Sequence, residues 1–267
     1  MKKLKLAAVM GAVLLTAAAC SKSDSTDAAA DGPATGSTPA KVAEEAQAAP
    51  INIPESELVS VSNLNSCMKI AAGLLPASSD ASAAETREKI ARFIAPEKFK
   101  GVNDVFAIKD VVASMESDIQ AFAVPPGGAK FMTFTVTPDS HHNRDTMVNA
   151  YDPQGPGFVD MTGQLREEAG MNFSEWGGRG NFNCSFHSTM DKDWKAWYVV
   201  QDEAQARAVE SARSNKVLRV RFDYIVDGLD LAAHAPTIRA RVAAVHLTDL
   251  NGNVLASPTY YLPEYLR

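Results

Sequence analysis

The hydrophobic period of this chain changes once, and that change constrains the fold more than any other feature of the sequence. Apolar residues recur at spacings of three and four over residues 105–122, which is typical of an amphipathic helix. This pattern ends at the Pro-Pro-Gly-Gly run at 125–128. Beyond it, Met132, Phe134 and Val136 alternate with threonines, as in a half-buried strand. The sequence therefore predicts helices first and strands afterwards.

Two shorter helices are predicted before the change of period. Apolar residues at helical spacing over 64–75 end at Pro76 and place Cys67 on the apolar face. Ser82 and Glu85 have the spacing of a capping box, which predicts the start of the second helix. We interpret the apolar stripe of the third helix, over 105–122, as core.

The strongest strand signals lie near the C-terminus. Over residues 218–226, apolar side chains share one face, and Arg219, Arg221 and Asp223 lie on the other. Residues 237–248 form a long strand whose apolar phase slips, and a bulge near residues 243–244 explains the slip.

Turn and helix signals complete this C-terminal region. Asn251-Gly252 favours a tight type I′ turn into a return strand. Asp202, with Gln205 three residues later, predicts one more helix, which Asn215 closes.

This order of elements predicts an α+β fold, with N-terminal helices packed on a mostly antiparallel β-sheet and one or two further helices. We expect a single domain over residues 51–267, with a helical part at 51–125 and a sheet part at 129–262.

The N-terminus has the three parts of a secretory signal. Lysines at positions 2, 3 and 5 precede an apolar run at 6–15 and three alanines at 17–19, and Cys20 follows. The alanines and Cys20 resemble the lipobox of bacterial lipoproteins. That resemblance implies cleavage after residue 19 and lipidation of Cys20, and Ser21 favours the outer membrane over the inner one. Residues 21–50 contain no Leu, Ile, Met or aromatic residue. We therefore expect residues 20–50 to form a disordered tether.

Charge and cysteine usage narrow the setting further. Of 26 basic and 32 acidic residues, three lysines leave with the signal, so the mature chain is acidic and nucleic acid is not an expected partner. Cys67 and Cys184 remain after lipidation, and an oxidising compartment favours a disulfide between them. Two free buried thiols, or a reactive or metal-binding thiol, are the alternatives.

Groups suited to catalysis are few. Asp139, His141 and His142 lie within four residues, and His187 is a fourth candidate ligand for a metal ion. We interpret residues 139–142 as an exposed polar turn and His246 as a solitary packed or surface residue. No nucleophile elbow, phosphate-binding loop or dinucleotide fingerprint is present, so we assign no catalytic residue and expect no cofactor.

Five segments together resemble uncharacterised proteobacterial envelope lipoproteins that carry a domain of unknown function. These are the lipobox and residues 103–119, 150–161, 217–226 and 242–255. The resemblance implies a location and an architecture, and it brings no activity or catalytic residue with it.

The expected function is that of a periplasm-facing lipoprotein, held in the outer membrane of a bacterial cell envelope by its lipid. We expect a non-enzymatic module that binds an envelope protein or another envelope component. One alternative is a metal-dependent hydrolase that uses the 139–142 loop. The other is a small-ligand carrier built around Trp176, Trp194 and Trp197.

Overall fold

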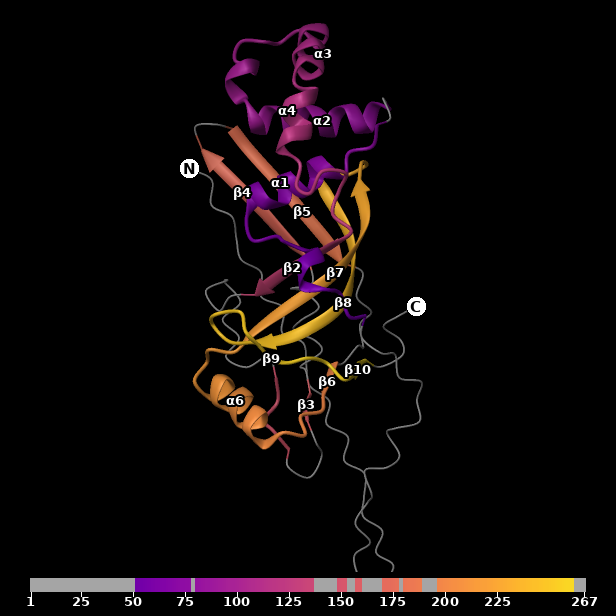
Figure 1. Cartoon of the computed structure of the whole chain (residues 1–267). Coiled ribbons are helices and arrows are strands. Elements are labelled where there is room, and N and C mark those ends of the chain that lie inside the picture. Colours follow the sequence, from indigo (N-terminus) through magenta and orange to yellow (C-terminus); the bar gives the residue numbers. More distant parts are fainter. Residues whose placement is uncertain are drawn as a thin grey trace, which may run out of the picture. The chain divides into compact units, whose positions relative to one another are not determined.

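Among the described residues up to 136, the chain forms four α-helices. The computed structural model describes residues 51–77, 80–136, 148–152, 157–159, 170–177, 180–188 and 196–261, which lie within one compact unit, Pro39–Arg267. The four helices are α1 (Leu64–Gly73), α2 (Ala81–Ile94), α3 (Val105–Ser114) and α4 (Glu116–Phe122). Helices α2, α3 and α4 contact one another, and α1 contacts α4 (Figure 1). None of the described helices is long and apolar enough to cross a membrane.

Polar side chains fix where helices α1 and α2 begin. Asn63 accepts a hydrogen bond from the Ser66 amide, and the Ser66 hydroxyl accepts one from the Asn63 amide. Asp80 accepts from the amide of Ala83 and begins α2. The predicted capping box at Ser82 is therefore wrong. An aspartate caps as well as a serine, and its charge also suits the positive end of the helix dipole.

The predicted third helix is two helices. α3 ends at Ser114, Met115 has non-helical dihedral angles, and α4 begins at Glu116. Met115 is fully buried, whereas Val105 is 62% exposed. The prediction that this stripe is core is right for its second half and wrong for its first turn. The hydrophobic period alone does not show whether another element covers a given turn.

Seven strands form a mixed, mostly antiparallel sheet, so the predicted α+β fold is confirmed. Their spatial order is β1-β2-β7-β8-β5-β4, and β9 also pairs with β8. The pairs β1–β2 and β5–β8 are parallel, and the others are antiparallel. The strands are β1 (Leu58–Ser60), β2 (Phe131–Val136), β4 (Met171–Gly177), β5 (Gly180–Ser188), β7 (Arg219–Asp230), β8 (Thr237–Thr248) and β9 (Val254–Ala256).

The bulge predicted in the long C-terminal strand is confirmed. Tyr224 pairs with Val242 and Asp223 pairs with Ala244, so Ala243 is one extra residue in β8. The extra residue changes the phase of the strand, because successive side chains of a strand point to opposite faces. Val245 therefore returns to the apolar face, as the partner of Phe222.

The predicted type I′ turn at Asn251-Gly252 is wrong. That turn needs a positive φ at both central residues, and among the described residues only Lys216 is a non-glycine with positive φ. The loop instead has three residues, and Gly252 alone takes the left-handed conformation, with φ +84°. The Asp249 carboxylate accepts hydrogen bonds from the amides of Asn251 and Asn253 and so holds the longer loop.

The helix predicted to begin at Asp202 is confirmed. α6 (Glu203–Ser214) begins at Asp202, whose carboxylate accepts a hydrogen bond from the Ala204 amide, and Asn215 caps its end. Helix α6 contacts β9, and the side-chain Nε2 of Gln205 donates a hydrogen bond to the Leu255 carbonyl oxygen. A smaller three-stranded sheet contains β3 (Phe158–Val159), β6 (Ala196–Tyr198) and β10 (Tyr260–Tyr261).

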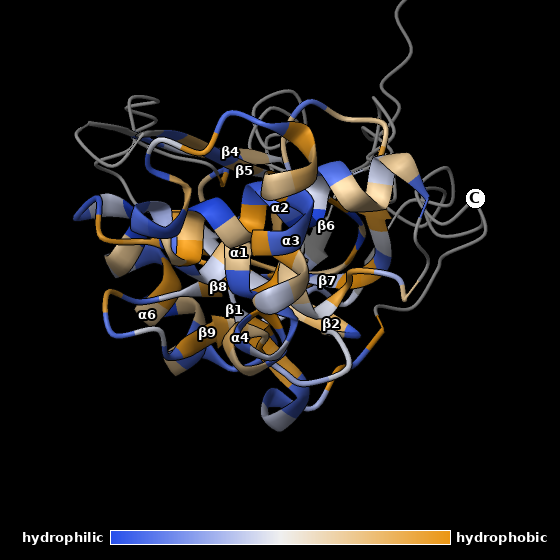
Figure 2. Cartoon of the chain, turned by 90° about the horizontal axis from the view of Figure 1, so that it is seen from above, coloured by the Kyte–Doolittle hydropathy of each residue, from blue (hydrophilic) through white to orange (hydrophobic). Residues whose placement is uncertain are grey.

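One hydrophobic core joins the N-terminal helices to the central sheet and continues to α6, and within it α1 contacts β4 and β5. Phe186 of β5 stacks edge to face with Phe134 of β2 and with Tyr224 of β7, at ring-centre distances of 5.5 Å and 5.3 Å. Such aromatic pairs stabilise a fold by more than the burial of their apolar area alone. The helices carry both apolar and polar stretches, as expected when one face packs inward (Figure 2).

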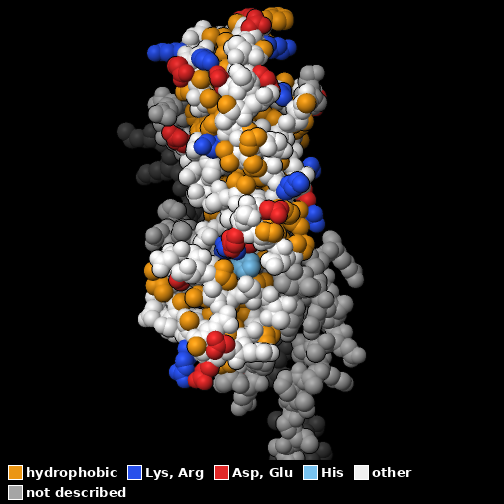
Figure 3. All heavy atoms as spheres, viewed as in Figure 1, with side chains coloured by type: hydrophobic (Ala, Val, Ile, Leu, Met, Phe, Trp, Pro, Cys, Tyr) orange, Lys and Arg blue, Asp and Glu red, His pale blue; other side chains and the backbone are white. Residues whose placement is uncertain are grey.

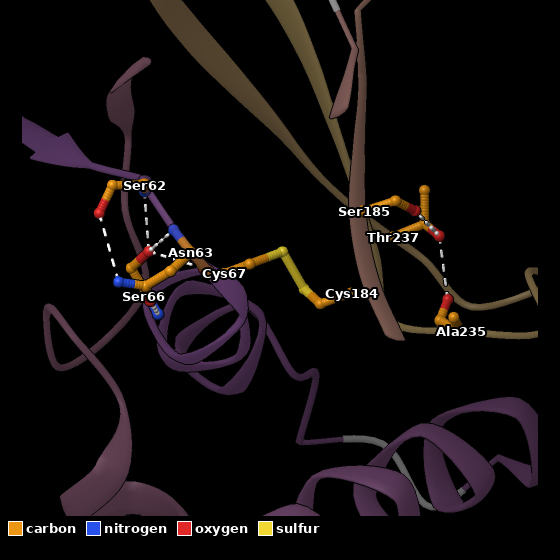
Figure 4. The surroundings of a disulfide bond; sticks show 8 residues. All are labelled: Ser62, Asn63, Ser66, Cys67, Cys184, Ser185, Ala235 and Thr237. Carbon is orange, nitrogen blue, oxygen red and sulfur yellow. Dashed lines mark hydrogen bonds between the residues drawn. A yellow bond between two sulfur atoms is a disulfide. The ribbon is translucent and has the colours of Figure 1, made fainter. Parts of the chain in front are cut away.

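A disulfide joins the helical part to the sheet, as the cysteine count predicts. Cys67 of α1 and Cys184 of β5 are bonded, with Cα atoms 6.0 Å apart, within the range of about 4.4–6.8 Å that a disulfide requires. Figure 4 shows the bridge between two sets of hydrogen bonds. On one side is the cap of α1, and on the other the Ser185 and Thr237 hydroxyls hydrogen-bond at 2.9 Å. The bridge therefore connects two segments that are each held in place by their own hydrogen bonds.

Loss of the bridge is expected to destabilise the fold. The bridge spans 117 residues of sequence, and removing a native disulfide typically costs about 2–5 kcal/mol. We expect the double variant Cys67→Ala, Cys184→Ala to show that loss in denaturant unfolding, and reduced wild-type protein to match it. An unchanged unfolding midpoint after both thiols are reduced and alkylated would contradict this expectation.

Candidate functional site

An apolar groove runs between α2 and α3. It has a volume of about 880 Å³. Its apolar floor comes from Ala81 and Ala84 of α2 and from Ile108, Val112 and Ala113 of α3. On α2 these alanines lie on one face, and the opposite face is buried through Ala83 and Ile90. α2 therefore buries one face and lines the groove with the other, where two alanines lie among the charged side chains of Glu85, Arg87 and Glu88.

The first turn of α3 exposes two large apolar side chains beside this groove. Val105 lines the groove and is 62% exposed, and the adjacent Phe106 is 73% exposed. The Lys109 ammonium lies 6.0 Å from the centre of the Phe106 ring, so the ring meets a cation on its own helix. Apolar side chains reach the surface at the end of the molecule where α3 lies (Figure 3).

The acidic side chains at the rim are paired with bases. Lys89 donates to Glu85 at 2.7 Å, and this contact holds the pKa of the Glu85 carboxyl below its usual range. Glu88 pairs with the next basic residue of the helix, Arg92, at 2.7 Å. These contacts are exposed or half-buried, so they shape the rim and contribute little stability.

Arg87 connects the two sides of the groove. Its Nε lies 3.3 Å from Glu116 Oε2 at the start of α4, which is an ion pair without hydrogen-bond alignment. Its terminal nitrogen donates to the Pro76 carbonyl oxygen at 2.9 Å. Glu85, Glu88 and Glu116 thus all contact a basic side chain. None of these three carboxylates is therefore left without a basic partner.

Apart from Cys67 and Cys184, the residues named as site candidates from the sequence do not meet in the described part of the chain. Cys20, Asp139, His141 and His142 lie outside the described residues. His187 is exposed on β5. No three His, Cys, Asp or Glu side chains of the described residues converge to hold a metal ion. The metal site of the 139–142 loop stays a prediction.

The tryptophans give no groove that can be described. Trp176 belongs to β4 and Trp197 to β6, whereas Trp194 lies outside the described residues. The two strands belong to different sheets. The carrier hypothesis built on these residues stays a prediction.

One histidine interpretation is wrong, because His246 does not stand alone. Its Nε2 lies 3.1 Å from Asp223 Oδ2, and its Nδ1 lies 3.0 Å from the Ser257 hydroxyl. Arg221 also contacts the same carboxylate, at 3.1 Å. Sequence reasoning missed this polar cluster because its members lie in separate elements. The one available signal was the bulge near residue 243, which decides the face to which His246 points.

Comparisons with known proteins leave the family open. No family model, no curated protein and no solved structure matches the chain. The resemblance to envelope lipoproteins, carried by the lipobox and four further segments, stays a prediction.

Phe106 is expected to be dispensable for folding, unlike Met115 in the same region. Phe106→Ala removes a side chain that is 73% exposed, and surface changes of this kind usually stay within about 0.5 kcal/mol. Met115→Ala, at a fully buried position, is expected to cost about 2–5 kcal/mol. Urea unfolding of both variants measures the difference. Equal losses would mean that Phe106 packs in the core.

Proposed function

We propose that this chain is a lipid-anchored protein of a bacterial cell envelope that binds an amphipathic helix of another envelope protein. Cys20 carries the lipid, Ser21 directs the protein to the outer membrane, and the folded part faces the periplasm. The binding site is the groove between α2 and α3. The observation that carries this proposal is the exposure of Phe106 and Val105 at the edge of an apolar groove.

A helix fits the groove better than other occupants do. The floor is rich in alanine, through Ala81, Ala84 and Ala113, and small side chains let another backbone approach closely. α3 has 10 residues and therefore runs for about 15 Å, roughly three helical turns. An amphipathic helix offers apolar side chains at matching intervals, and this mode of recognition recurs among peptide-binding proteins.

The exposed aromatic side chain favours a protein partner over a small ligand. A small ligand is mostly enclosed by its pocket, and Phe106 is not among the residues that line the groove. A partner helix that extends past Val105 covers Phe106 as well. Large aromatic side chains that a partner covers commonly carry much of the binding energy of an interface.

Two features support the location. The N-terminal pattern before Cys20 has the parts of a lipoprotein signal. The disulfide between Cys67 and Cys184 suits an oxidising compartment such as the periplasm, because cytosolic thiols are kept reduced.

A photo-crosslinking amino acid at position 106 tests the partner. We expect it to capture a segment of an envelope protein with apolar residues at helical spacing, identified by mass spectrometry of the crosslinked peptide. The matched control is the same amino acid at Leu250, which is 57% exposed on a distant loop. Equal capture at both positions, or a crosslinked segment without that spacing, contradicts the proposal.

Binding of the captured segment as a synthetic peptide then tests the groove itself. Ala84→Glu places a charge on the floor of the groove at an exposed position, and we expect at least about tenfold weaker binding, equivalent to about 1.4 kcal/mol. Ala121→Glu, at an exposed position of α4 away from the groove, is the matched control and should bind normally. Calorimetry with the full-length protein in detergent measures both.

The anchor is tested by fractionation. Cys20→Ala removes the thiol that the lipid needs, so we expect soluble protein or an uncleaved precursor. Ser21→Asp is expected to move the protein to the inner membrane. Wild-type protein found free in the soluble periplasm would refute the lipid anchor and leave the groove proposal standing.

A further inference from the structure

A serine, a histidine and an aspartate from three places in the chain form one hydrogen-bonded series. Asp223 is in β7, His246 is in β8, and Ser257 directly follows β9. The His246 ring lies 3.1 Å from the Asp223 carboxylate through Nε2 and 3.0 Å from the Ser257 hydroxyl through Nδ1. Both distances fall in the range of about 2.6–3.2 Å that joins a nucleophile, its base and the group that orients the base.

The bulge at Ala243 is what brings these residues together. With Tyr224 paired to Val242, an unbulged β8 would place His246 opposite Val220, whose side chain is in the core. The extra residue places His246 opposite Arg221 instead. Bulges are common beside active sites, because they redirect a side chain.

The pairing of β9 then sets the position of the serine. Ala256 of β9 pairs with Leu247 of β8. Ser257, the next residue after Ala256, therefore lies beside His246, the neighbour of Leu247. Ser257 is exposed, so its hydroxyl can be reached from water.

The aspartate is held by more than the histidine. Asp223 is 1% exposed. Its Oδ1 accepts a hydrogen bond from the Thr133 hydroxyl at 2.8 Å, and its Oδ2 accepts one from Arg221 at 3.1 Å. Arg221 also pairs with Glu55, at 2.7 Å. The guanidinium compensates the buried charge, and the contacts together fix the carboxylate in place.

This arrangement sets the tautomer of the histidine. An ionised carboxylate only accepts hydrogen bonds, so Asp223 favours the neutral imidazole that carries its proton on Nε2. The lone pair of Nδ1 then faces Ser257, whose hydroxyl donates to it. The ring nitrogens have exchanged the places they take in the best-known serine proteases, but the roles of base and orienting carboxylate are the same.

We propose that Ser257, His246 and Asp223 form a nucleophilic centre that hydrolyses carboxylic esters with a small acyl group, an activity separate from helix binding in the groove. The small acyl group follows from the exposure of Ser257. A long chain gains little at a surface where it stays in contact with water.

The reaction has two balanced steps. Ser257 Oγ attacks the ester carbonyl carbon while its proton passes to His246 Nδ1, and Asp223 stabilises the imidazolium through Nε2. The bond from the carbonyl carbon to the alkoxy oxygen breaks, the alcohol leaves with the proton from Nδ1, and an acyl-serine remains. Water then attacks that ester with Nδ1 again as the base, which releases the carboxylic acid and restores the Ser257 hydroxyl.

A structural role alone does not require this cluster. Buried ion pairs are often no more stabilising than apolar side chains of similar size. Nor does the bond between Ser257 and His246 serve to satisfy a fully buried group, because Ser257 is exposed and the His246 side chain is 15% exposed. Water can replace the serine there.

Labelling with a fluorophosphonate probe tests the centre in the full-length protein in detergent. We expect a covalent adduct on Ser257, found by peptide mass mapping and lost in Ser257→Ala. Ser214→Ala, which changes another exposed serine with a carboxylate neighbour, should leave the labelling unchanged. Absence of an adduct on Ser257 overturns the proposal.

The role of His246 is tested by rate. In His246→Gln we expect labelling of Ser257 and hydrolysis of p-nitrophenyl acetate to fall about 10²-fold or more. As a second measurement, Ser257→Cys should react with iodoacetamide faster than Ser214→Cys, and the advantage should vanish when His246→Gln is added. Equal rates with and without His246 would mean that the cluster only ties the residue after β9 to β8.

Discussion

The pairing of β7 with β8, with one extra residue at Ala243, determines both faces of the central sheet. On the apolar side, the extra residue places Val245 opposite Phe222, and the Phe222 side chain is fully buried. On the polar side it sets His246 opposite Arg221 and beside Asp223. Removing one residue there would exchange the two sets of side chains, because the side-chain period of a strand is two. A single local irregularity therefore fixes the core and the polar cluster together.

The disulfide connects this sheet to the N-terminal helices. β5 pairs with β8 in parallel, and Cys184 of β5 is bonded to Cys67 of α1. α1 contacts α4, and α4 contacts α2 and α3, which form the groove. The groove is thus connected to the sheet through one bonded helix and the packing that follows it. The groove and the polar cluster share no residue, so point mutations can test the proposed helix binding and the proposed ester hydrolysis separately.

Most of the fold could be predicted from the sequence because local patterns carried it. The change of period at residues 125–128 separated helices from strands, and the slip of phase in the long strand located the bulge. The errors arose where distant contacts decide. Whether Val105 is buried depends on which element packs over α3. The spacing of apolar residues in the sequence is the same whether Val105 is buried or exposed. The polar cluster was missed for a similar reason, since Asp223 and His246 meet only once the register of two strands is known.

Two features of this fold depart from what stability alone favours. Phe106 leaves most of an aromatic ring in water, and Asp223 places a carboxylate where almost no water reaches it. The hydrophobic effect favours burial of the Phe106 ring, and the cost of desolvating a charge favours exposure of the Asp223 carboxylate. Each departure has its own local support, since Lys109 lies over the ring and Arg221 holds the carboxylate. Violations of local rules in an otherwise consistent fold are expected at functional positions. We connect the exposed ring with the proposed partner-binding surface, and the buried carboxylate with the proposed role of His246, which requires a single ring orientation.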